Sequence, residues 1–168
     1  MSIIVLTLLA APIHALRMIR NAFLALLALA LPVFGGGLKI EELGEQISGK
    51  DQMTQADIDG KLVVAHLWEA HCGACKTAVP AFQKEIRSGG KQVVPLILHR
   101  NDKVELAKET AKGMRLKLPV FHGSEDVRFK AKTWPCVIIV KPDGEVLYNG
   151  SPGEAYEKAL RAAKKELR

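Results

Sequence analysis

The side chains best suited to chemistry are two cysteines separated by two residues, in the run His71-Cys72-Gly73-Ala74-Cys75-Lys76. Two thiols at this spacing can exchange disulfides, bind a metal, carry a haem or simply cross-link the chain. Haem attachment requires a histidine directly after the second cysteine, where this sequence has Lys76. A structural zinc site needs about four ligands, which would have to include Cys136 and a histidine such as His66 or His99. The pattern favours redox chemistry, with zinc as the alternative.

The cysteine pair lies where a strand is expected to give way to a helix. Residues 62–67 (LVVAHL) form a short apolar run typical of a buried strand, and apolar residues recur at helical spacing from Val79 to Ile86. A thiolate at a helix N-terminus meets free backbone N–H groups and the positive end of the helix dipole, which lowers the thiol pKa. We therefore expect Cys72 to attack a disulfide and Cys75 to resolve the resulting mixed disulfide.

The elements beyond this helix predict a mixed sheet. Apolar runs predict further strands at residues 93–98, 137–140 and 145–148. Amphipathic stripes predict helices at residues 104–114 and 156–167. The order β-α-β-α-β-β-α combines a parallel crossover with a hairpin, which indicates an α/β fold whose mixed β-sheet has helices on both faces. We expect the 62–67 strand to be central and the 93–98 strand to lie toward an edge, because Pro95 lacks an N–H group.

The N-terminus is set apart by its hydrophobicity. Residues 22–34 are apolar throughout and follow two arginines. This run is shorter than the roughly 20 residues of a membrane-spanning helix and resembles the hydrophobic region of a signal peptide. We expect residues 1–37 to be a signal peptide or an N-terminal membrane anchor and residues 38–168 to be the folded domain. Met18 is an alternative start of translation.

Composition and charge argue against several functional classes. The chain is 48% hydrophobic and 25% charged, as expected of an ordinary globular domain. Its net charge of +6 comes from scattered basic residues with no aromatic-flanked block, so we expect no nucleic-acid partner. The three cysteines are an odd number, which does not suit a disulfide framework.

Several of these segments resemble the thioredoxin superfamily. Residues 63–75 (VVAHLWEAHCGAC) are similar to its strand, tryptophan and CxxC motif, and Thr133-Trp134-Pro135 is similar to its cis-proline loop. Residues 141–145 (KPDGE) resemble a turn of the TlpA/ResA-type branch of exported, often membrane-tethered reductases. The resemblance covers roughly residues 53–165. It implies a thioredoxin-like fold and thiol-disulfide exchange on protein substrates.

The resemblance also suggests supporting residues. Trp68 would pack beneath the CxxC loop, and a cis Pro135 would present backbone groups to an extended substrate. His66 stands where thioredoxin has a buried aspartate that assists proton transfer to the second sulfur; the alternative is a hydrogen-bonded core histidine. His71, when protonated, would stabilise the Cys72 thiolate, and the alternative is a plain exposed histidine.

The third cysteine and the direction of electron flow are less constrained. Cys136 is either a small buried apolar side chain or a third redox thiol near the pair. The Gly-Ala dipeptide replaces the Gly-Pro of thioredoxin, so the resemblance does not fix the reduction potential. The favoured function is a reductase in the periplasm or at the extracytoplasmic face of the membrane. It would need a membrane electron-donor protein and no cofactor beyond its cysteines. The alternatives are a disulfide oxidase or isomerase, or a non-catalytic binding module.

Overall fold

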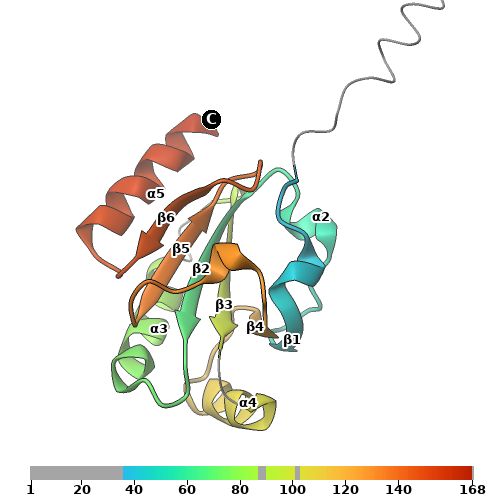
Figure 1. The fold of residues 1–168 in the computed structure, drawn as a ribbon, viewed down its shortest axis with the longest axis vertical. Helices are drawn as coiled ribbons and strands as arrows, with labels where there is room; N and C mark the ends of the chain where they lie inside the picture. Colours follow the sequence, from blue (N-terminus) through green and yellow to red (C-terminus); the bar gives the residue numbers. More distant parts are fainter. Residues whose placement is uncertain (1–35, 87–89, 101–102, 168) are drawn as a thin grey trace, which may run out of the picture. The chain divides into compact units, whose positions relative to one another are not determined.

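A computed structural model describes residues 36–86, 90–100 and 103–167, which build a six-stranded sheet in the order β1-β4-β3-β2-β5-β6 (Figure 1). Its elements are η1 (Ile40–Leu43), β1 (Gly44–Ser48), α2 (Gln55–Ile58), β2 (Leu62–Trp68), α3 (Gly73–Ile86), β3 (Val93–His99), α4 (Val104–Gly113), β4 (Val120–Gly123), η2 (Val127–Phe129), β5 (Cys136–Val140), β6 (Val146–Gly150) and α5 (Glu154–Glu166). The expected signal peptide or membrane anchor covers residues 1–37. Of these, residues 1–35 lie outside the described part of the chain. No helix in the described ranges is long and apolar enough to cross a membrane.

Strand β2 is central, as the sequence predicts. It pairs in parallel with β3 and antiparallel with β5, and all seven of its residues are buried. Its side chains alternate between two apolar clusters: Val63, Ala65 and Leu67 enter one, while Leu62 and Val64 enter the other. Since the sheet is covered on both faces, β2 reads as a continuous apolar run rather than an alternating one.

Helices cover both faces of this mixed sheet, which confirms the predicted fold class. The buried residues of α3, α4 and α5 pack on one face, and those of η1, α2 and η2 pack on the other. The connections β2–α3–β3 and β3–α4–β4 step across the sheet in the same direction. Because such crossovers are right-handed, both helices fall on the same face. The CxxC sequence therefore lies at the carboxyl end of the central strand.

The expectation that β3 lies toward an edge is wrong. Strand β3 has neighbours on both sides, but its ladder with β4 begins only at Ile97. There, Ile97 N–H donates to the Pro119 carbonyl. One step earlier, a parallel ladder would need the N–H groups of Pro95 and Pro119 as donors. Neither exists, so the two prolines end the ladder, and Pro95 is tolerated within an interior strand because β4 does not reach it.

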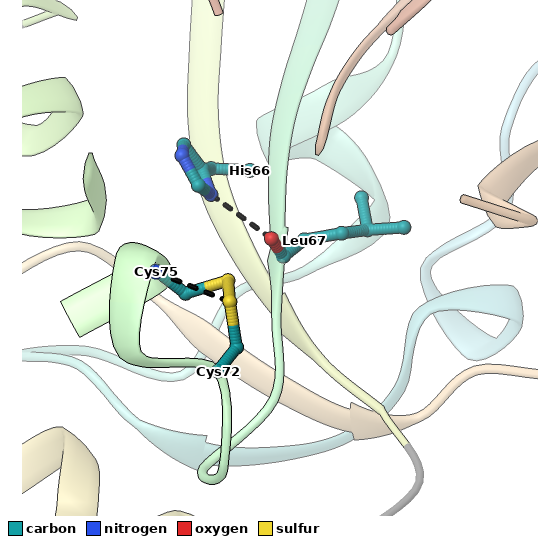
Figure 2. Close-up of a disulfide and its surroundings, with 4 residues drawn as sticks. All are labelled: His66, Leu67, Cys72 and Cys75. Atoms are coloured by element: carbon teal, nitrogen blue, oxygen red, sulfur yellow. Dashed lines mark hydrogen bonds between the residues drawn. A yellow bond between two sulfur atoms is a disulfide. The ribbon is translucent and has the colours of Figure 1, made fainter. Parts of the chain in front are cut away.

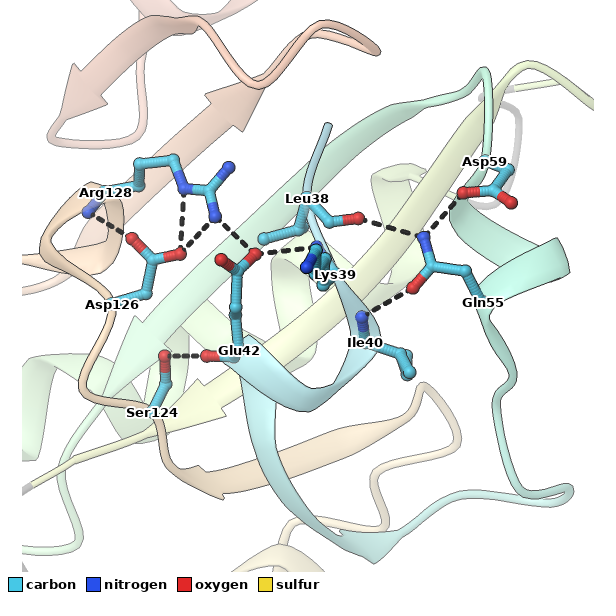
Figure 3. Close-up of polar contacts among 9 residues, drawn as sticks. All are labelled: Leu38, Lys39, Ile40, Glu42, Gln55, Asp59, Ser124, Asp126 and Arg128. Atoms are coloured by element: carbon cyan, nitrogen blue, oxygen red, sulfur yellow. Dashed lines mark hydrogen bonds and ion pairs between the residues drawn. The ribbon is translucent and has the colours of Figure 1, made fainter. Parts of the chain in front are cut away.

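A strap at residues 36–43 covers the face of the sheet that lacks long helices (Figure 3). Leu38 and Leu43 are buried in the cluster that includes Val63. The side-chain amide of Gln55 acts as a strand-like partner for the strap: it accepts from Ile40 N–H at 2.8 Å and donates to the Leu38 carbonyl at 3.1 Å. The strap is therefore an integral part of the core.

Charged residues hold the same strap to the loop that leads to η2. Arg128 Nη2 donates to the carboxylates of Glu42 and Asp126, each at 2.5 Å, and Ser124 Oγ donates to the Glu42 carbonyl at 2.6 Å (Figure 3). Burial works to raise the pKa of Asp126, but the hydrogen bonds from Arg128 outweigh it and hold that pKa below its usual value. The network thus joins segments that are far apart in the sequence.

Candidate active site

Cys72 and Cys75 form a disulfide, with their sulfur atoms 2.09 Å apart (Figure 2). Cys72 directly precedes the first residue of α3, so its side chain stands at the helix N-terminus. Its Sγ accepts the backbone N–H of Cys75 at 3.1 Å, and its carbonyl accepts the N–H groups of Cys75 and Lys76. The N–H group of Cys75, in the first helical turn, therefore points to the Cys72 sulfur, where it would stabilise a thiolate.

The two sulfurs differ in their access to solvent. Cys72 is partly exposed, whereas Cys75 is fully buried on the side of α3 that faces the sheet. Cys75 packs with Trp68 and Val79 in one apolar cluster, and Cys72 contacts the edge of that cluster. An incoming disulfide can reach only the first sulfur, as expected for a nucleophile followed by a resolving thiol.

His66 lies on the same side of β2 as the disulfide, whereas the side chain of Leu67 points to the other side (Figure 2). It is fully buried, and its ring packs against Phe82 of α3 with centroids 5.1 Å apart. Its Nδ1 lies 3.1 Å from the Leu67 carbonyl, which can only accept, so Nδ1 carries the proton. Nε2 therefore carries a lone pair, and this atom is buried without a hydrogen-bond partner. Burial lowers the pKa of His66 to about 4, so the ring is neutral at pH 7.

Trp68 is fully buried in the cluster that contains Cys75, as the resemblance implies. Strand register places it beside His99 on β3, and His99 beside His122 on β4. The Trp68 and His99 rings are 4.6 Å apart edge to face, and the two histidine Nδ1 atoms are 3.1 Å apart. The sequence alone does not predict a contact between His99 and His122, although both lie near the carboxyl ends of their strands.

The loop before β5 lies next to the CxxC loop. Cys136 pairs with Leu67 near the end of β2, so the preceding residues leave the sheet at the end where the CxxC sequence follows β2. The Trp134–Pro135 peptide bond is cis, as the resemblance implies. Trp134 is 38% exposed, whereas the chain's other tryptophan, Trp68, is fully buried.

Cys136 points away from the cysteine pair. It pairs with Leu67 and shares that residue's apolar cluster, whereas Cys75 belongs to the cluster on the opposite face. Its thiol donates to Asn149 Oδ1 at 3.3 Å, and burial raises the pKa of the thiol. These contacts match the interpretation of Cys136 as a small buried side chain. His71, by contrast, is exposed beside Cys72. Within the described ranges, no three potential metal ligands cluster.

Several solved structures are similar to this chain in fold. A thiol-disulfide isomerase from Corynebacterium glutamicum is 19% identical, with a TM-score of 0.60 over 77% of this chain and 96% of that chain. A secreted Mycobacterium tuberculosis disulfide oxidoreductase, described as homologous to E. coli DsbE, is 16% identical, with a TM-score of 0.54 over 73% and 98% of the two chains. StoA from Bacillus subtilis is 18% identical, with a TM-score of 0.51 over 60% and 81%. The fold and the cysteine pair thus define a thioredoxin-like protein.

The family follows from the sequence itself. The model of the AhpC/TSA family matches residues 39–149, which is more than half of the chain. The chain therefore belongs to the AhpC/TSA family, and its predicted place in the thioredoxin superfamily is confirmed. A search of curated proteins found no match.

Proposed function

We propose that this protein is a thiol-disulfide oxidoreductase that reduces protein disulfides outside the cytoplasm through Cys72 and Cys75. The observation that carries the proposal is the unequal access of the two sulfurs at a helix N-terminus: Cys72 is partly exposed and Cys75 is buried directly behind it. An inert cross-link would not need this arrangement, whereas a nucleophile with a resolving thiol does.

The exchange proceeds in two steps. The Cys72 thiolate attacks one sulfur of a substrate disulfide, so an S–S bond to the substrate forms and the other substrate sulfur leaves as a thiolate. The Cys75 thiolate then attacks Cys72 Sγ, which forms the Cys72–Cys75 disulfide and releases the second substrate thiolate. Two electrons have passed to the substrate. A dithiol of a membrane electron-donor protein returns the pair to its reduced form by the same chemistry in reverse.

His66 is the proposed proton acceptor for Cys75. Its neutral ring, its bare Nε2 lone pair and its position on the same side of β2 support this role (Figure 2). A buried thiol must lose its proton before it can attack, because the thiolate is the nucleophile. The His71 side chain, exposed beside Cys72, is proposed to stabilise the first thiolate when protonated. Trp134 and the cis Pro135 are proposed to border the bound substrate segment.

Two observations support an extracytoplasmic location. Residues 22–34 are apolar and follow two arginines, as in a signal peptide or an anchor. The similar structures include one described as secreted. A reductase in an oxidising compartment needs a continuous supply of electrons, which is why the proposal includes a membrane donor.

The decisive test combines trapping with a reduction potential. Cys75→Ser should accumulate a mixed disulfide with a substrate protein, Cys72→Ser should form none, and Cys136→Ala should behave as the unmodified protein does. The potential of the Cys72–Cys75 pair, measured against a dithiothreitol series, should lie near or below about −270 mV. A value near about −120 mV would instead identify a disulfide donor. Absence of any reversible couple would leave a binding module.

A further inference from the structure

A groove lies at the end of the sheet opposite the cysteine pair. It has a volume of about 410 Å³, and its apolar lining residues include Met53, Val94 and Leu118. Parallel strands β2, β3 and β4 begin at this end and finish at the other, where the CxxC sequence follows β2. The groove opens where Pro95 and Pro119 stop the ladder between β3 and β4.

Lysines surround this groove. Its lining includes Lys50, Lys61, Lys91 and Lys117. Lys61 is held in place because its Nζ donates to the Asp57 carbonyl at 2.8 Å, whereas the other three form no ion pair with any described residue.

Among the described residues that line the groove, two have carboxylates. They belong to Asp51 and Asp57. The Asp57 carboxylate already accepts the N–H and the hydroxyl of Thr54, at 2.7 and 2.9 Å. The groove therefore has a surplus of positive charge that no described group neutralises.

The chain enters the domain at the same end. Gly37 lies against the carbonyl of Pro142, and the carbonyl of Gly36 lies against Gly144, in the turn that follows β5. Since β5 runs antiparallel to β2, that turn is at the end where β2 begins. Figure 1 shows this end of the domain opposite the loop that joins β2 to α3.

Few residues separate the apolar segment of the N-terminus from this entry point in the sequence. The apolar segment stops at Phe34, and Leu38 is already buried in the domain. Four residues span at most about 14 Å when fully extended. A domain tethered through residues 22–34 would therefore keep this end close to the lipid headgroups, within about two Debye lengths at physiological salt.

We propose that the lysine-lined groove docks on the anionic headgroups of the membrane that holds the N-terminus, and so directs Cys72 away from the bilayer. The argument combines charge complementarity with the length and the end point of the tether. It rests on the anchorage in the proposed function, in the form in which the N-terminus is retained. Lysine ammonium groups reach the phosphates, and the apolar lining residues face the headgroup region.

The test uses the full chain reconstituted into vesicles and an amine-acylating reagent read by mass spectrometry. In vesicles of phosphatidylglycerol and phosphatidylcholine, Lys50, Lys91 and Lys117 should be protected relative to vesicles of phosphatidylcholine alone. Lys103, which precedes α4 at the opposite end, should react equally in both. High salt should remove the protection, because the contacts are electrostatic.

A pair of variants makes the test specific. Combining Lys50→Gln with Lys91→Gln should lower the ratio of docked to free domain about 25-fold, roughly fivefold for each lysine, and expose Lys117. Combining Lys103→Gln with Lys158→Gln, a lysine of α5 that does not line the groove, should leave the protection intact. The proposal is overturned if Lys117 reacts equally with both vesicles, if neutral vesicles protect it as well, if only an acidic protein protects it, or if the native chain is released from the membrane.

The docking and the chemistry fail separately in this design. Disulfide exchange with a soluble substrate should be the same for the two double variants and for the unmodified protein. Loss of exchange in all three, with the protection pattern intact, would refute the oxidoreductase proposal and leave the membrane docking standing.

Discussion

The neutral, buried state of His66 makes the stability of the domain depend on pH in a predictable direction. Its pKa falls from an ordinary value of 6.5 to about 4 because burial disfavours the charged ring. Between these two pH values, His66 therefore binds a proton in the unfolded chain but not in the folded domain. The contribution of the neutral His66 ring to the free energy of unfolding is fully present above pH 6.5, and it is lost as the pH is lowered toward 4.

The size of the effect follows from the two pKa values. From pH 7 to pH 5, the free energy of unfolding should fall by about 2 kcal/mol, and by about 3 kcal/mol at pH 4, on account of this one ring. The matched variant is His66→Leu, which replaces the ring by an apolar side chain of similar size. His71→Gln, which changes an exposed ring, serves as the control.

Urea unfolding of the oxidised domain, from Gly35 to the C-terminus, at pH 7 and pH 5 measures this difference. The unmodified domain and His71→Gln should lose about 2 kcal/mol more than His66→Leu over that interval. All residues other than 66 and 71 are the same in the three proteins, so their contributions cancel in the comparison. If His66→Leu lost as much stability as the unmodified domain, the buried ring would not be held neutral, and the argument for a bare Nε2 lone pair would fail.

Three further outcomes follow from the described contacts. Leu43→Ala should destabilise the domain by about 2–5 kcal/mol in urea unfolding, because this side chain is fully buried in the strap; a cost below 1 kcal/mol would remove the strap from the core. Gln55→Leu should cost about 1–3 kcal/mol, measured in the same way, because Ile40 N–H and the Leu38 carbonyl lose their partner, and no loss would mean that water replaces the amide. Cys136→Ala should leave the Cys72–Cys75 potential unchanged within error, since its thiol lies on the opposite face of the sheet; a shift of more than about 30 mV would contradict that separation.

The sequence was most informative where local pattern and chemistry agree. The apolar run of β2 and the helical spacing after Cys75 fixed the position of the CxxC sequence, and both are properties of neighbouring residues. The cis Pro135 came from resemblance alone, because an arbitrary bond before proline is cis in only about 5–6% of cases. Periodicity could not decide which way the His66 ring points, and the sheet register settles it.

The misplaced strand and the missed segments have physical causes. Pro95 alone favours an edge strand, but its effect depends on Pro119, which lies on a different strand and matters only once the register is known. The strap and β1 have no apolar periodicity, so the sequence does not predict them. The strap is held by the side chains of Gln55 and Arg128, and β1 is held by backbone pairing with β4. The contacts among Trp68, His99 and His122 depend on the register of three neighbouring strands, which the sequence does not give.

The pairing of distant strands has a consequence for how the chain acquires its structure. Gly44 pairs with Gly123 at one side of the sheet, and Val63 pairs with Val140 at its centre. High contact order of this kind slows folding, because long loops must close before the pairing repays their entropy. A chain that emerges N-terminus first presents the strap and β2 long before β5 exists. The sheet can therefore close only once nearly the whole chain is present, and until then β2 lacks its antiparallel neighbour β5.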